Sequence, residues 1–217
     1  MSSTTIQLSA SKRDSEAVLQ ALAPQWYRLD IVPRALGELG SDDEGELSFT
    51  GPKASLGDWG ELLDYATSHP VQAVQFLCTQ PHDDLYLYLW TEGEEHRISV
   101  ELGLGRLRHF ESDDYPIGAY QVAVMLALAG AAEADVLAYG KRYQDLFVAL
   151  EPAALLDELR AGTLLDKWTP AVHLFSTDII SKAEIELALR ANDGWHLRHT
   201  ISTAGYHVLS QYAGAPK

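Results

Sequence analysis

The stretch that decides the fold lies between residues 71 and 102. It reads VQAVQFLC (71–78), LYLYLW (85–90) and HRISVEL (96–102), joined by short polar segments. In the middle segment three leucines alternate with Tyr86, Tyr88 and Trp90. A period of two predicts an antiparallel meander whose middle strand has one aliphatic and one aromatic face. We expect both faces to be covered.

A second pattern of three strands follows nearer the end of the chain, at residues 172–175, 185–191 and 195–202. Asn192, Asp193 and Gly194 form a strong hairpin signal before the third. A similar helical text precedes each meander, GELLDYA and AALLDEL. One reading is a degenerate duplication, with halves at 55–110 and 151–212 of a single domain covering 1–217. Chance similarity is the alternative, and residues 179–189 fit one helix equally well.

The other elements are predicted from caps, breakers and periodicity. Asp14 or Ser15 would cap the first helix and Pro24 would end it, while Pro152 and Gly162 bracket a later one. The predictions are strands at 4–8 and 26–32, a loop at 33–45, and helices at 11–23, 55–68, 116–132, 136–150 and 152–160. Together they predict an α+β fold of antiparallel β-meanders packed with helices.

Composition indicates a globular protein with a substantial core. The chain has 217 residues, of which 47% are hydrophobic. Cys78 is the single cysteine and lies in an apolar run, so we expect a buried thiol and no disulfide. The first twenty residues lack the apolar core of a signal peptide, and the apolar run 116–132 is short for a membrane span. We therefore expect a cytoplasmic protein.

The sequence carries no familiar catalytic or cofactor-binding motif: GxGxxG, the phosphate loop, HExxH and CxxC are all missing. His196 and His199 would lie on opposite faces of a strand but on one face of a helix, and His207 could approach them through a turn. A metal-dependent or small-ligand-binding enzyme using these histidines is the rival reading. His82 beside Asp83 and Asp84 fits an ordinary polar loop better than a general base. We expect no enzyme and no cofactor.

Charge is the strongest functional signal. The chain has 31 acidic against 16 basic side chains, a net charge of −15, which repels nucleic acid and anionic membranes and attracts basic proteins. The acids gather in three expected turns. If these converge beside the aromatic strands, they form a partner-binding surface; individually, each is also a normal solvated turn. The candidate partner-binding residues are Asp42, Asp43, Glu44, Glu46, Glu92, Glu94, Glu95, Glu111, Asp113 and Asp114.

In overall character, an acidic, motif-free α+β chain with aromatic strands, this sequence resembles the immunity proteins that bacteria encode beside polymorphic or type VI secreted toxins. The resemblance implies binding to a cognate toxin that acts in the cytoplasm, such as a basic nuclease, and neutralisation by masking its active site. An effector chaperone or adaptor would use the same charge. The resemblance assigns no residue and leaves the oligomeric state open.

Overall fold

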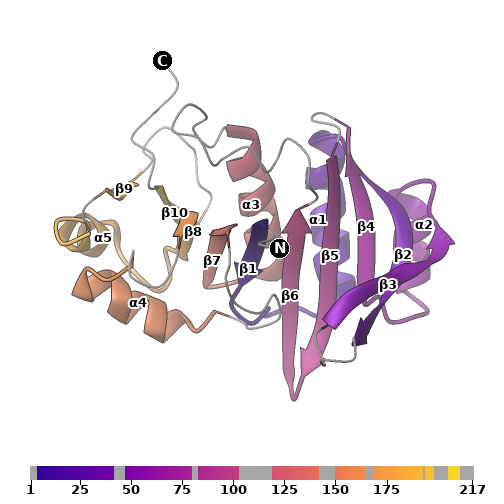
Figure 1. The fold of residues 1–217 in the computed structure, drawn as a ribbon, viewed down its shortest axis with the longest axis horizontal. Helices are drawn as coiled ribbons and strands as arrows, with labels where there is room; N and C mark the ends of the chain where they lie inside the picture. Colours follow the sequence, from indigo (N-terminus) through magenta and orange to yellow (C-terminus); the bar gives the residue numbers. More distant parts are fainter. Residues whose placement is uncertain are drawn as a thin grey trace.

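The computed structural model shows one ten-stranded sheet in the order β3-β2-β4-β5-β6-β1-β7-β8-β10-β9, with every neighbouring pair antiparallel. Five helices accompany the sheet in the described part of the chain, so the predicted α+β class is confirmed (Figure 1). The described residues are 4–41, 47–79, 83–102, 119–141, 150–164, 169–192, 194–197 and 205–210.

The first strand lies in the middle of the sheet. β1 (Thr4–Leu8) is a confirmed prediction, and it pairs on one side with β6 (Glu95–Leu102) and on the other with β7 (Val136–Lys141). Ile6 lies opposite Val100 and Tyr139 in these two ladders. The strand therefore joins the β2–β6 part of the sheet to the β7–β10 part.

The predicted meander is confirmed as β4 (Ala73–Cys78), β5 (Asp83–Glu92) and β6. Its neighbour is a hairpin of β2 (Ile31–Ser41) and β3 (Leu47–Ser55). The predictions of a strand at 26–32 and a loop at 33–45 are wrong at this point. A register shift after Pro33 lets the strand accommodate the proline, and pairing on both sides holds the glycine-containing part extended.

Helix α1 (Ser15–Arg28) is capped by Asp14 as predicted, because the Asp14 carboxylate accepts a hydrogen bond from the Ala17 amide at 2.8 Å. The predicted start at residue 11 is wrong, since Ser11 forms a β-bridge with His96. The prediction that Pro24 ends α1 is wrong, since the helix continues for another turn. An interior proline costs about 3 kcal/mol. Trp26 is fully buried against Phe76, with ring centroids 5.0 Å apart, and burying such a side chain contributes about 3–5 kcal/mol.

Helices α1, α2 (Trp59–Ala66) and α3 (Ala119–Ala132) cover one face of the sheet. α2 is shorter than the helix predicted at 55–68. Burial of Val122 and Leu128 confirms α3 as a core helix. Cys78 is also buried as expected, with its sulfur 2.6 Å from the Tyr120 hydroxyl. No helix in the described ranges is long and apolar enough to cross a membrane.

A second apolar layer covers the other face of the sheet at β7, β8 (Thr169–Ser176) and β10 (Tyr206–Ser210). It is built from α4 (Pro152–Ala161) and α5 (Lys182–Ala188), at the left of Figure 1, while β9 (His196–Leu197) forms the sheet edge. The predicted α4 is confirmed. Its end is fixed by Gly162, which has a φ of 77° and follows the last helical residue.

Two predictions fail in this part of the chain for related reasons. The expected helix at 136–150 begins as strand β7, because Val136 and Ala138 face the second layer while Leu137 and Tyr139 face the first. A strand buried on both faces has no alternation for the sequence to show. The expected strand at 185–191 is instead α5, capped by Ser181 and Glu184 in a capping box.

The second half therefore runs α4-β8-α5-β9-β10 and has a helix where a duplicated meander needs its middle strand. The alternative reading of 179–189 as helical gives the correct element type. The expected third strand at 195–202 overlaps β9, and residues 198–204 lie outside the described part of the chain.

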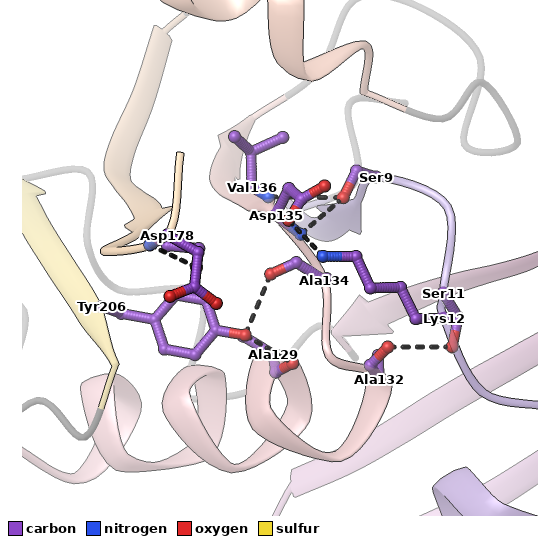
Figure 2. A network of polar contacts seen from close by, with 11 residues as sticks. Ser9, Ser11, Lys12, Ala129, Ala132, Ala134, Asp135, Val136, Asp178 and Tyr206 are labelled. Atoms are coloured by element: carbon purple, nitrogen blue, oxygen red, sulfur yellow. Dashed lines mark hydrogen bonds and ion pairs between the residues drawn. The ribbon is translucent and has the colours of Figure 1, made fainter. Parts of the chain in front are cut away.

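A polar network fixes the end of α3 and the start of β7 (Figure 2). The Ser9 hydroxyl oxygen accepts hydrogen bonds from the backbone amides of Asp135 at 3.0 Å and Val136 at 3.3 Å. Lys12 places its ammonium 2.6 Å from the Asp135 carboxylate. The segment that follows β1 is thus attached to the α3–β7 junction by both backbone and side-chain contacts.

Candidate functional site

The acidic turn, which we define as Glu92, Gly93, Glu94 and Glu95, connects β5 to β6. Glu92 and Glu95 form the last pair of the ladder, leaving Gly93 and Glu94 as the two turn residues. Gly93 has a φ of 63°, as expected for glycine at the first position of such a tight hairpin. All three carboxylate residues are exposed. The sequence-predicted acidic turn therefore lies on the surface, at the bottom of Figure 1.

Arg97 partly neutralises the acidic turn. Its guanidinium lies 2.5 Å from the Glu95 carboxylate and 3.5 Å from that of Glu92, and its side chain is 12% exposed. Within the described residues, Glu94 has no ion-pair partner. Three carboxylates against one guanidinium leave the turn with a formal charge of −2, carried on a rigid two-strand support.

The other candidate acids, Asp42, Asp43, Glu44, Glu46, Glu111, Asp113 and Asp114, lie outside the described residues. The strands that flank the first group are described. In the strand ladders Gly37 pairs with Ala73, and Ala73 pairs with Tyr88. Ser41 lies four residues after Gly37 on β2, and Glu92 lies four residues after Tyr88 on β5. Because β2 and β5 run in the same direction, the segment 42–46 is attached at the same end of the sheet as the acidic turn.

The segment 103–118 is attached at the opposite end. It follows Leu102, the last residue of β6, which is paired with Thr4 far from the acidic turn. After it, the Tyr120 hydroxyl donates to the Leu29 carbonyl at 2.9 Å, near the start of β2. Convergence of all three acidic groups stays a prediction, and the described anchors bring two of them to one end.

An aromatic surface accompanies the acidic turn on β5. Leu85, Leu87 and Leu89 join the core under the helices, so Tyr86, Tyr88 and Trp90 face the other side, as the alternation predicts. Tyr88 is buried and donates a hydrogen bond to Glu101 at 2.9 Å. Burial, and then the Glu101 carboxylate, raises the pKa of Tyr88. Tyr86 and Trp90 are partly exposed. The prediction that this face is covered is therefore confirmed for Tyr88 and wrong for Tyr86 and Trp90.

Carboxylates lie close to the exposed edge of this aromatic surface. Burial raises the pKa of Tyr86, and the negative charges of Asp84 and Glu101 raise it further. Aromatic rings next to carboxylates are suited to arginine, whose planar guanidinium stacks on a ring while it donates to a carboxylate. The chemistry of this part of β5 and β6 therefore favours recognition of basic side chains.

The rival histidine site is not assembled by the described strands. His196 lies opposite Ser210 in the β9–β10 ladder, and His207 is three residues from Ser210, so the two histidines face opposite sides of the sheet. His207 places Nε2 3.2 Å from the Ile180 carbonyl oxygen. His199 and His82 lie outside the described residues. Within the ranges given above, no three His, Cys, Asp or Glu side chains are grouped to hold a metal ion.

One titratable residue that the sequence analysis did not single out is His173 on β8. It is buried in the second apolar layer, with its ring centroid 5.0 Å from that of Trp195. Burial lowers its pKa to about 3. The alternation in VHLF (172–175) could have predicted that His173 faces inward. No sequence pattern predicts that burial lowers the pKa of a histidine.

Comparisons with known proteins identify no family. No family model matches the chain. No curated protein matches it either. Among solved structures, the fold is similar to the Pseudomonas aeruginosa T6SS protein PA0821, with a TM-score of 0.47 and 10% sequence identity. The alignment covers 97% of this chain and 65% of that one, so this chain spans a little under two thirds of that protein's length.

Proposed function

We propose that this protein is a binding protein that captures a basic toxin acting in the cytoplasm and neutralises it by covering its active site. The observation that carries the proposal is the exposed acidic turn on a rigid hairpin, next to partly exposed Tyr86 and Trp90, in a chain of net charge −15. In this proposal the protein acts by binding, without catalysis of its own, in the cytoplasm. A basic nuclease fits the charge.

The mechanism has a long-range and a short-range part. The summed negative field accelerates encounter with a cationic surface, and this attraction is screened by salt over about 10 Å at 0.1 M. At contact, Glu94 offers a carboxylate without an ion-pair partner in the described residues, and Tyr86 and Trp90 offer aromatic area that can be desolvated. A toxin held in this way would present its cationic cleft to the hairpin and lose access to substrate.

The test uses the product of the reading frame next to this gene as the candidate toxin. Cells expressing it should grow when this protein is co-expressed, and the purified pair should associate at a rate that falls at least tenfold between about 0.05 and 0.5 M NaCl. The triple variant E92Q/E94Q/E95Q should slow association, because it removes three charges from the turn. E151Q/D157N/E186Q removes three exposed charges near α4 and α5 and serves as the matched control.

Equal association rates for the two triple variants would exclude the acidic turn as the interface. Activity measurements on the purified complex separate neutralisation from delivery. A silent complex supports neutralisation, whereas a complex that retains the toxin's full activity contradicts it and favours an adaptor or chaperone.

A further inference from the structure

A groove of about 650 Å³ opens where the N-terminus of α1, the C-terminus of α2 and the ends of β5 and β6 meet. Its lining comes from four separate stretches of chain, residues 14–16, 66–72, 89–91 and His96. The last two stretches flank the acidic turn directly in sequence. The groove and the acidic turn therefore form one continuous surface at this end of the sheet.

The electrostatics of the groove favour a cation. Asp14 and Glu16 line it, and its lining residues, all in the described part of the chain, include no lysine or arginine. The half positive charge at the α1 N-terminus and the half negative charge at the α2 C-terminus roughly cancel, so the two carboxylates decide the sign. The basic side chains nearest to the lining in sequence are paired with other carboxylates: Lys12 with Asp135, Arg13 with Glu133, and Arg97 with Glu95 and Glu92.

Both carboxylates have room to accept a further donor. Asp14 uses Oδ1 to cap the Ala17 amide at 2.8 Å, and Glu16 uses Oε1 to accept from Gln20 at 2.8 Å. Within the described residues, the second oxygen of each carboxylate accepts no hydrogen bond. Asp14, the N-cap, and Glu16, in the first turn of α1, both line the groove, so each can accept N–H groups of a guanidinium.

The lining residue His69 supplies a planar group that suits the same ligand. The His69 ring stacks on Tyr65 with centroids 4.6 Å apart and an interplanar angle of 18°. Flat rings stack against the planar face of a guanidinium. Lysine, a point charge with no planar group, uses fewer of these features.

We propose that this groove binds an arginine-bearing segment of a basic protein partner, with the guanidinium between Asp14 and Glu16 and the chain leading onto the acidic turn. The inference rests on the proposed function for the partner's basic character. A protein segment fits better than a small molecule, because the groove is open and its lining residues Thr91 and His96 adjoin the acidic turn in sequence.

The experiment titrates the full chain with an acetylated, amidated pentapeptide of sequence Gly-Arg-Gly-Arg-Gly and follows backbone amides by NMR. Saturable shifts are expected at residues 14–16, 66–72, 89–91 and 96, and the peptide with glutamine in place of arginine should give none. D14N/E16Q should weaken binding about fivefold, since each exposed ion pair contributes roughly 0.5 kcal/mol. Asparagine is as good an N-cap as aspartate, so α1 is expected to be retained.

Two further variants keep the result interpretable. D157N/E186Q makes the same charge change at α4 and α5 and should bind the peptide as the parent does. T91K places a cation at the exposed rim and should abolish the shifts even if D14N/E16Q folds poorly. Chemical-shift changes confined to other residues would contradict the proposed peptide site. Equal peptide affinities of D14N/E16Q and D157N/E186Q would contradict it as well.

The two proposals fail separately. In one outcome E92Q/E94Q/E95Q no longer captures the toxin, and the parent protein does not bind the peptide. The proposed function then stands, and peptide binding in the groove is excluded. In the other outcome the parent protein binds the peptide specifically but neither captures nor silences the candidate toxin. The groove then stands as a binding site, and the proposed function is excluded.

Discussion

The hydroxyl of Tyr206 lies 2.9 Å from the carbonyl oxygen of Ala129, although 77 residues separate them, and 2.9 Å from that of Ala134 (Figure 2). The single hydroxyl proton of Tyr206 is thus shared between a carbonyl in the last turn of α3 and one just beyond the helix. Burial, and then the charges of Asp135, Glu133 and Asp178, raises the pKa of Tyr206 to about 12, so the hydroxyl keeps its proton at neutral pH.

Replacing Tyr206 with phenylalanine should therefore destabilise the protein by about 1–2 kcal/mol, because the two carbonyl oxygens lose the buried hydroxyl that they share while the ring still packs. The Ala129 oxygen keeps the hydrogen bond from the Ala134 amide at 3.0 Å. Urea denaturation followed by circular dichroism measures the change. Tyr27→Phe is the control, since Tyr27 is 67% exposed and should be neutral. Equal stability of the two variants would show that the hydroxyl contributes nothing.

His173 should make the protein sensitive to acid. Its pKa is about 3 in the folded state and near 6.5 when unfolded, so the unfolded chain binds the proton more tightly. Stability is therefore complete above about pH 6.5 and falls as the pH drops towards 3, by at most about 1.4 kcal/mol per unit. On acidification the unfolding free energy of the parent should fall relative to that of His173→Leu, when both are measured at several pH values. A constant difference would contradict this assignment.

Pro24→Ala should stabilise the protein by about 1–2 kcal/mol. The exposed proline lies inside α1 and deprives the helix of one backbone hydrogen bond, whereas alanine restores it at some cost in unfolded-state entropy. Thermal unfolding measures the gain. Pro152→Ala is the comparison, because a proline at the first position of α4 removes no helical hydrogen bond and should not be improved.

Gly162→Ala should destabilise the protein by more than about 1 kcal/mol. The residue has a φ of 77°, and a Cβ there would lie 2.7 Å from the Ala191 carbonyl oxygen. Gly130→Ala provides the opposite case, because this glycine lies in α3 with nothing within 4 Å of the added atom. Denaturation midpoints that move in the same direction for both variants would be inconsistent with the geometry.

The sequence predicts those parts of the fold where one local rule is enough. Alternation in LYLYLW identifies β5, and Pro152 with Gly162 identifies α4. It fails where tertiary packing decides. Burial of Trp26 carries α1 past Pro24, and burial of Val136 and Leu137 on opposite faces removes the alternation that would reveal β7.

The candidate site divides in the same way. Glu92, Glu94 and Glu95 are adjacent in the chain, so a turn rule places them together and on the surface. The groove beside them could not be predicted, since Asp14, His69 and His96 come from stretches that only the packing of α1 and α2 on the sheet brings together.

The central position of β1 has a consequence for synthesis. These five residues leave the ribosome long before their partners, which end at residue 102 on one side and residue 141 on the other. Once β6 has emerged, β1 can pair with it, and its second edge then stays open until β7 arrives. A chain halted between these points would expose a vacant strand position, which another nascent copy could fill.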